Sequence, residues 1–368
     1  MAAIDISPVL KFMVEKGGSD LFFSTGAAIH IDVEGKTIPV NSQIMTPGMI
    51  KEVAYAMMSQ KQQQEFETTL EMNFAYGVKD VGRFRVNVFR QRGEVSMVIR
   101  HIKSEIPSFE TLGLPGILQE LILRQRGLIL VVGATGSGKS TSLASMIDLR
   151  NSTTTGHILT LEDPIEFMHN HKKSVVDQRE IGIDTWSFEE GLKNAMRQAP
   201  DVILIGEVRD AEGMKNALTY AETGHLCLAT LHANNANQAI KRIISFFPPE
   251  TREGMLFGLS LNLVSIVSQR LVPGLQTKRV AAIEVMINSP YITELIQKSK
   301  LEEIKEAMAE NEDVGMCTFD QSLFRLFSNG KIDEENALAY ADSRNDLSLK
   351  IRFAREGSKS GGFGQIMD

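Results

Sequence analysis

Apolar and polar positions alternate in two different ways along this chain. Between residues 127 and 231, short apolar runs are separated by stretches with helical spacing. Such runs are typical of strands that are buried on both faces. They lie at residues 127–133, 157–161, 202–206 and 226–231. Strands that alternate with helices predict an α/β fold with a parallel sheet covered by helices on both sides.

The first hundred residues contain several short segments with strand character, and one of them alternates strictly. Phe84, Val86 and Val88 alternate with Arg83, Arg85 and Asn87, so one face of this strand is buried and the other carries guanidinium groups. We expect strands at residues 28–33, 36–40, 72–78, 83–91 and 94–102. Ser7 is expected to cap a first helix and Thr46 a second helix that ends near Met58. The segment therefore reads as a small α+β unit.

These patterns divide the chain of 368 residues into a smaller N-terminal domain at 1–103 and a larger one at 116–355. Residues 104–115 contain two prolines and are expected to form a linker. From residue 237 the larger domain is expected to be mainly helical. The Gly/Ser-rich residues 356–368 are expected to form a flexible tail.

Composition narrows the class of protein. The net charge of −7 argues against a dedicated nucleic-acid binder. Cys227 and Cys317 are the only cysteines, so the sequence has neither a disulfide framework nor a Cys-x-x-Cys zinc motif. There is no signal-peptide pattern and no apolar run of membrane-spanning length, so we expect a cytoplasmic protein.

The strand at 127–133 leads directly into a phosphate-binding pattern, G-x-x-x-x-G-K-[ST]. We expect Lys139 to neutralise the β- and γ-phosphate oxygens of ATP and the Ser140 hydroxyl to ligate Mg²⁺. A chance glycine-rich turn is the alternative, but the strand before the loop and the helix after it favour a phosphate-binding loop. The residues expected to bind nucleotide are Gly133, Ala134, Thr135, Gly136, Ser137, Gly138, Lys139, Ser140 and Thr141.

Two acidic segments follow expected strands. The first carries Glu162, Asp163 and Glu166, and the second ends in Glu207. Gly206 stands where nucleotide-hydrolysing proteins usually have a magnesium-binding aspartate. We therefore expect Glu207 to orient the attacking water with help from Glu162. A solvated or helix-capping carboxylate is the alternative for each, and the roles of Asp163 and Glu166 stay open.

Two histidines, His225 and His232, flank the strand at 226–231. Their spacing across a strand does not suit a zinc site. Both are therefore expected to sense the γ-phosphate or to couple subunits, although a lone histidine is more often structural.

Four ordered motifs, GATGSGKST, LEDPIEF, DVILIGEVRD and GHLCLATLHANNA, together resemble the type II/IV secretion ATPase superfamily. The segments SDLFFSTGAAIHIDVEG, GRFRVNVFRQRG, SQRLVPG and GMCTFDQSL are similar to the type IV pilus retraction branch. The missing four-cysteine zinc motif also favours that branch over the assembly ATPases. Residues 291–298, YITELIQK, lack the arginines of the main retraction motors, which points to the accessory members of the branch.

The resemblance implies a PAS-like N-terminal domain, a RecA-like P-loop core and a homohexameric ring that hydrolyses ATP with Mg²⁺ during pilus retraction and twitching motility. It implies that Arg85 and Arg100 reach the phosphates, that His232 senses them, and that Arg209 bridges a subunit or domain contact. A solvated or ion-paired arginine is the alternative for Arg85 and for Arg100. Implied partners are a retraction-motor paralogue and the inner-membrane pilus platform protein, with the ring peripheral at the inner membrane. Alternatives are an accessory interaction subunit in which hydrolysis is dispensable and, less favoured, a nucleic-acid translocase.

Overall fold

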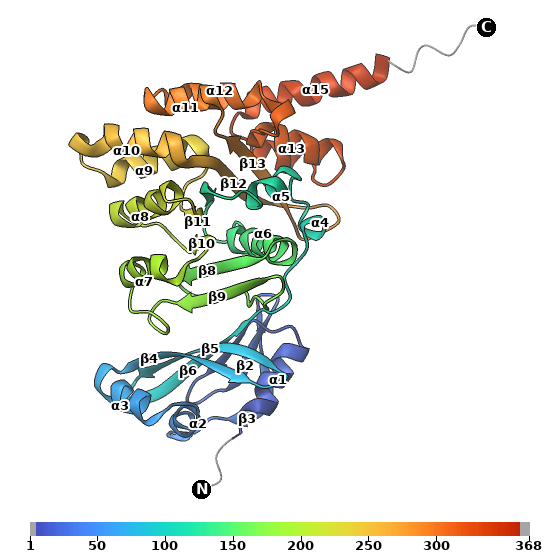
Figure 1. The fold of residues 1–368 in the computed structure, drawn as a ribbon. Coiled ribbons are helices and arrows are strands. Elements are labelled where there is room, and N and C mark those ends of the chain that lie inside the picture. The colour runs from blue at the N-terminus through green and yellow to red at the C-terminus, as the bar shows by residue number, and fades with distance from the viewer. Residues whose placement is uncertain (1–4, 361–368) are drawn as a thin grey trace. The chain divides into compact units, whose positions relative to one another are not determined.

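The computed structural model describes residues 5–360, which form two compact units (Figure 1). The first unit contains the chain up to Glu105 together with the segments Pro164–Met168 and Glu180–Trp186. The second contains Ile106–Asp163, His169–Arg179 and the chain from Ser187 onward. No helix in this range is long and apolar enough to cross a bilayer.

The first unit is built on an antiparallel sheet with six strands among the described residues, in the order β3-β2-β1-β6-β5-β4. The strands are β1 (Asp20–Phe23), β2 (Ala28–Val33), β3 (Lys36–Ile44), β4 (Glu71–Val78), β5 (Gly82–Gln91) and β6 (Glu94–Ile102). The helices are α1 (Ser7–Glu15), α2 (Met49–Met57) and α3 (Gln60–Thr69). On β5 the side chains of Phe84, Val86 and Val88 are fully buried, as the alternation predicts.

Both predicted helix caps in this unit are wrong. Helix α1 begins at Ser7 itself, and the Asp5 carboxylate accepts a 2.9 Å hydrogen bond from the Ser7 N–H. Helix α2 begins after Gly48, whose φ of +86° suits glycine, rather than after Thr46. The prediction also missed two elements, β1 and α3. Of these, α3 is polar and buries only Phe66, so it lacks an apolar periodicity.

The second unit is built on a sheet with seven strands among the described residues, in the order β13-β12-β7-β11-β10-β8-β9. The strands are β7 (Gly127–Val132), β8 (Gly156–Glu162), β9 (Ser174–Glu180), β10 (Val202–Ile205), β11 (Leu226–Leu231), β12 (Leu263–Pro273) and β13 (Arg279–Ile287). From β12 to β8 all neighbouring strands are parallel, whereas β13 runs antiparallel to β12. The predicted α/β class is confirmed.

Helices cover both faces of this sheet, with α6 and α8 on opposite sides (Figure 1). Leu128, Leu130 and Val132 of β7 pack in one apolar core, and Ile129 and Val131 pack in another. The helices are α4 (Phe109–Leu112), α5 (Ile117–Ile122), α6 (Lys139–Thr153), α7 (Phe188–Ala195), α8 (Ala211–Glu222), α9 (Ala236–Phe246), α10 (Pro249–Asn262), α11 (Pro290–Gln297), α12 (Ile304–Ala309), α13 (Phe319–Ser328), α14 (Glu334–Ala339) and α15 (Arg344–Ser360), with 3₁₀ turns η1 (Met196–Gln198), η2 (Leu301–Glu303) and η3 (Glu312–Val314).

The expectation of a mainly helical segment from residue 237 is wrong for β12 and β13, which form a long hairpin at the sheet edge. Buried serines interrupt the apolar pattern of β12. Ser265 donates a 2.7 Å hydrogen bond to the Met286 carbonyl, and Ser268 donates one of 2.9 Å to Glu284. Pairing across the hairpin satisfies these polar groups, so they can be buried in strands.

The expected linker and tail carry structure of their own. The range 104–115 contains α4, and Phe109 of that helix is buried in the core that also contains α6 residues. Helix α15 continues to Ser360, so the first five residues of the expected tail are helical. Residues 361–368 lie outside the described range.

Candidate active site

The phosphate-binding loop joins the carboxyl end of β7 to helix α6. Gly136 and Gly138 have φ angles of +76° and +89°, which residues with a Cβ rarely adopt. The Lys139 ammonium donates hydrogen bonds to the carbonyls of Gly133 (2.8 Å) and Ala134 (3.0 Å). The lysine is therefore already folded over the loop that would hold the phosphates.

Two structural features of the loop suit the binding of a nucleotide phosphate. The Ser137 hydroxyl is buried and has no hydrogen-bond partner among the described residues, so a polar group is left for a ligand. A Cβ at Gly133 would lie 2.6 Å from the Gln269 carbonyl oxygen, so the close approach of the two backbones requires glycine there. The N-terminus of α6, 15 residues long, follows the loop directly.

A network of charged side chains lies at the carboxyl ends of the parallel strands β8, β10 and β11. The phosphate-binding loop follows the carboxyl end of β7 in the same way. Glu207 Oε2 accepts a 2.7 Å hydrogen bond from Arg209 Nε, and Glu207 Oε1 lies 3.2 Å from His232 Nε2. Arg209 Nη2 also lies 3.4 Å from Asp163 Oδ2. The hydrogen bond to Glu207 raises the pKa of Arg209. Three motifs that are separate in the sequence are thus joined around Glu207.

Gly206 occupies the usual aspartate position for a steric reason. A Cβ there would lie 2.9 Å from the Leu161 carbonyl oxygen and 3.1 Å from the Glu162 Cα. The Gly206 N–H donates a 2.7 Å hydrogen bond to that same carbonyl. Glu162 is held beside it, because its Oε1 accepts hydrogen bonds from Thr160 Oγ1 (2.7 Å) and Gln178 Nε2 (3.1 Å).

One histidine considered with this site lies at the other end of its strand. His225 precedes β11 and bonds Thr223 Oγ1 at 3.0 Å, whereas His232 follows β11, so the two lie at opposite edges of the sheet. Six strand residues thus separate His225 from His232, which follows the end of β11 nearer to Glu207, and a role of His225 in coupling subunits stays a prediction. Glu166 belongs to the first unit, unlike Asp163.

A family described as "Type II/IV secretion system protein" matches residues 3–320. The chain belongs to this family. Two relatives from Pseudomonas aeruginosa are similar over nearly the whole chain. "Type IV pilus ATPase PilU" is 51% identical over 96% of this chain and 93% of its own. "Type IV pilus retractation ATPase PilT" is 42% identical over 91% of this chain and 97% of its own.

A solved structure, of the pilus retraction motor PilT with bound ADP, superposes with a TM-score of 0.88 at 42% identity. The superposition covers 94% of this chain and 99% of the PilT chain. The predicted membership in the secretion ATPases, the retraction branch within them and the P-loop fold are confirmed.

Two arginines that the family resemblance implicates, Arg85 and Arg100, lie directly opposite each other on β5 and β6 of the first unit. Each faces a carboxylate. Arg100 Nε donates a 2.7 Å hydrogen bond to Asp20, and Arg85 Nε lies 3.8 Å from the buried Glu180, whose pKa burial raises. Their contact with phosphates stays a prediction.

Sequence reasoning missed Gln269 and Arg270 of β12. Gln269 is buried, and its Oε1 accepts a 2.8 Å hydrogen bond from Ser142 of α6. Its Nε2 would lie 2.7 Å from a Cβ at Gly138. Gln269 therefore packs behind the phosphate-binding loop of this secretion ATPase. The motif SQRLVPG contains Gln269 and Arg270. A family resemblance marks such a motif but does not say which residues its side chains contact.

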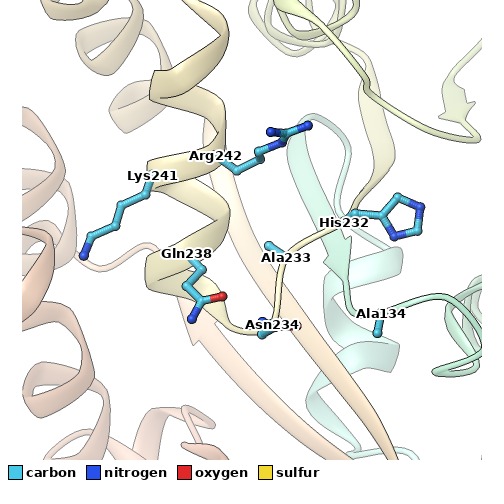
Figure 2. Close-up of a pocket in the computed structure, with 7 residues that line it drawn as sticks. All are labelled: Ala134, His232, Ala233, Asn234, Gln238, Lys241 and Arg242. Carbon is cyan, nitrogen blue, oxygen red and sulfur yellow. The ribbon is translucent and has the colours of Figure 1, made fainter.

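A pocket of about 430 Å³ opens beside the loop (Figure 2). His232, Ala233 and Asn234 come from the segment between β11 and α9, and the helix itself contributes the polar side chains at positions 238, 241 and 242. Ala134 of the phosphate-binding loop completes the lining. The His232 segment thus separates the loop from a cationic helix face.

Proposed function

We propose that this secretion ATPase hydrolyses ATP to drive or assist type IV pilus retraction, and with it twitching motility. The observation that carries the proposal is the placement of Glu207. This carboxylate lies at the same sheet edge as the phosphate-binding loop and is oriented by Arg209 and His232. The names of the relatives, a type IV pilus ATPase and a pilus retraction ATPase, support the assignment to pili.

In the proposed reaction, the backbone N–H groups of the loop and Lys139 bind the triphosphate and stabilise its developing charge. Glu207 orients water for in-line attack on the γ-phosphate. Both its oxygens have further lone pairs beyond the bonds to Arg209 and His232. Glu162 lies on the neighbouring strand and assists, and His232 reports on the phosphate through its contact with Glu207.

Mg²⁺ fits the site through Ser140, because this ion commonly combines one or two protein oxygens with phosphate oxygens and water. Among the described residues no group of three His, Cys, Asp or Glu side chains could hold a metal by itself. When bound, Mg²⁺ supplies charge neutralisation at the phosphate oxygens.

We further propose a homohexameric ring, cytoplasmic and peripheral at the inner membrane, with a retraction-motor paralogue and the pilus platform protein as partners. The acidic balance of the chain, −7, disfavours a role on nucleic acid.

A second candidate is an accessory subunit that docks on a paralogous motor and does not need its own hydrolysis. One observation favours it. Residues 291–298, whose sequence YITELIQK lacks arginine, form most of α11, and Tyr291 on this helix is half exposed. The intact Lys139, Ser140 and Glu207 argue against it.

Steady-state hydrolysis by the wild type, alone and with a retraction-motor paralogue, separates the candidates. We expect Glu207→Ala to lower kcat about 100-fold or more while nucleotide binding persists. Lys139→Ala should instead lose binding. Glu253→Ala, an exposed glutamate on α10, is the matched control and should keep full activity. Retraction in cells that survives Glu207→Ala would support the accessory subunit.

A further inference from the structure

Two adjacent residues of β12 connect the nucleotide site with different parts of the second unit. Because neighbouring strand residues point to opposite faces, Gln269 and Arg270 reach different partners. Gln269 contacts the phosphate-binding loop and α6. Arg270 reaches the segment after His232 and the C-terminal helices.

Arg270 is held by four contacts from three segments. Its Nη2 donates hydrogen bonds to the Asn234 carbonyl (3.2 Å) and to Asp342 Oδ1 (2.6 Å). Its Nη1 donates to the Tyr340 carbonyl at 2.7 Å. The guanidinium also stacks on the ring of Phe319 in α13, 3.8 Å from its centroid. A planar fork with several fixed donors suits this junction, which a lysine could not reproduce.

The partners of Arg270 are fixed in turn. Asp342 also pairs with Lys305 of α12 at 3.4 Å, and the Asp342 N–H donates to Asp320 of α13 at 2.8 Å. At its other end, the segment after His232 is tied to the hairpin, because Glu284 accepts a 2.8 Å hydrogen bond from the Ala236 N–H. The hairpin and the C-terminal helices thus hold the backbone that carries His232.

We propose that Arg270 is a positioning residue for hydrolysis, which sets the His232 segment, and through it Glu207, according to the position of the C-terminal helices. The role in hydrolysis rests on the proposed ATPase function. Arg270 bonds the backbone two residues beyond His232, and His232 contacts Glu207 at 3.2 Å. Arg270 should therefore affect turnover rather than the binding of nucleotide by the loop.

Hydrolysis kinetics and amide hydrogen exchange of the full chain test this role. We expect Arg270→Gln to lower kcat about tenfold, with the KM for ATP changed less than about twofold. In the absence of nucleotide, the hydrogen-bonded amides of residues 236, 238 and 239, at the start of α9, should exchange faster in Arg270→Gln than in the wild type. The double variant Arg270→Gln/His232→Ala should have a kcat close to that of His232→Ala alone, because Arg270 acts through His232. Asp342→Asn, which keeps the guanidinium, should show a smaller effect in the same direction.

The matched control is Arg325→Gln, since Arg325 also lies in the C-terminal part but pairs with Glu312 of η3. It should leave kcat and the exchange of the amides of residues 236, 238 and 239 unchanged. Equal effects of both arginine variants, fully multiplicative losses with His232→Ala, or unchanged exchange would overturn the role of Arg270. If the wild type hydrolyses no ATP in any mixture, the proposed function fails. Exchange of the three amides then decides the structural part independently, with unchanged rates refuting it.

Discussion

Restoring the usual aspartate at Gly206 should damage this protein rather than improve it. No positive φ marks this glycine, so the obstacle is space alone. A Cβ would meet the Leu161 carbonyl oxygen at 2.9 Å and the Glu162 Cα at 3.1 Å, both backbone atoms that cannot rotate away. Relief requires β8 and β10 to move apart, which stretches the 2.7 Å hydrogen bond between Gly206 and Leu161.

Overpacking of this kind costs about 1–3 kcal/mol. In a unit of this size each kcal/mol lowers Tm by about 2–4 °C, so we expect Gly206→Asp to melt roughly 5 °C lower. Hydrolysis should fall as well, because Glu162 and Glu207 flank the displaced backbone. Differential scanning fluorimetry and steady-state kinetics measure the two effects.

Two variants isolate the cause. Gly206→Ala adds only the Cβ and should show most of the loss. Gly116→Asp places the same side chain in open space at the N-cap of α5, where aspartate is favoured, and should leave Tm unchanged or slightly raised. A Gly206→Asp protein with wild-type Tm and turnover would refute the steric explanation.

Three further substitutions test buried polar groups. Burial raises the pKa of Glu284 from 4.5 to about 7. Between these pH values the folded state retains a proton that the unfolded state releases. The wild type therefore loses stability as the pH rises from 4.5 to about 7. Urea unfolding should therefore show Glu284→Gln gaining stability over wild type from pH 5 to pH 8, whereas the exposed Glu302→Gln should show no such trend. Ser142→Ala leaves the buried Gln269 oxygen without its donor and should cost about 1–3 kcal/mol in the same assay. Ser137→Ala removes an unpaired hydroxyl, so it should leave the apo protein at least as stable but weaken ATP binding in calorimetry; unchanged affinity would contradict a phosphate role.

Local sequence was sufficient for the phosphate-binding loop. Its glycines, Lys139 and the apolar strand before it lie within fifteen residues, and backbone geometry within that range forms the site. Glu207 and His232 were also identified from sequence, since each directly follows an apolar strand. Parallel strands bring their carboxyl ends to one edge, so such residues meet whenever the strands pair.

Other features depended on contacts between distant segments. Arg209 pairs with Asp163, 46 residues earlier, a contact that the sequence did not predict. His225 and His232 look equivalent in the sequence, but a strand separates them. The hairpin of β12 and β13 was hidden because Ser268 and Glu284 are polar, and only their pairing makes burial tolerable.

The sequence by itself therefore determined the fold class, the phosphate-binding loop and the candidate carboxylates, because these follow from periodicity and from residues close together in the chain. Tertiary structure alone decided which charges pair around Glu207, why position 206 must be glycine, and which residues support the loop from behind. Those outcomes depend on distances between strands that come from different parts of the chain. Pattern along one strand carries no information about the backbone or side chain that packs against it.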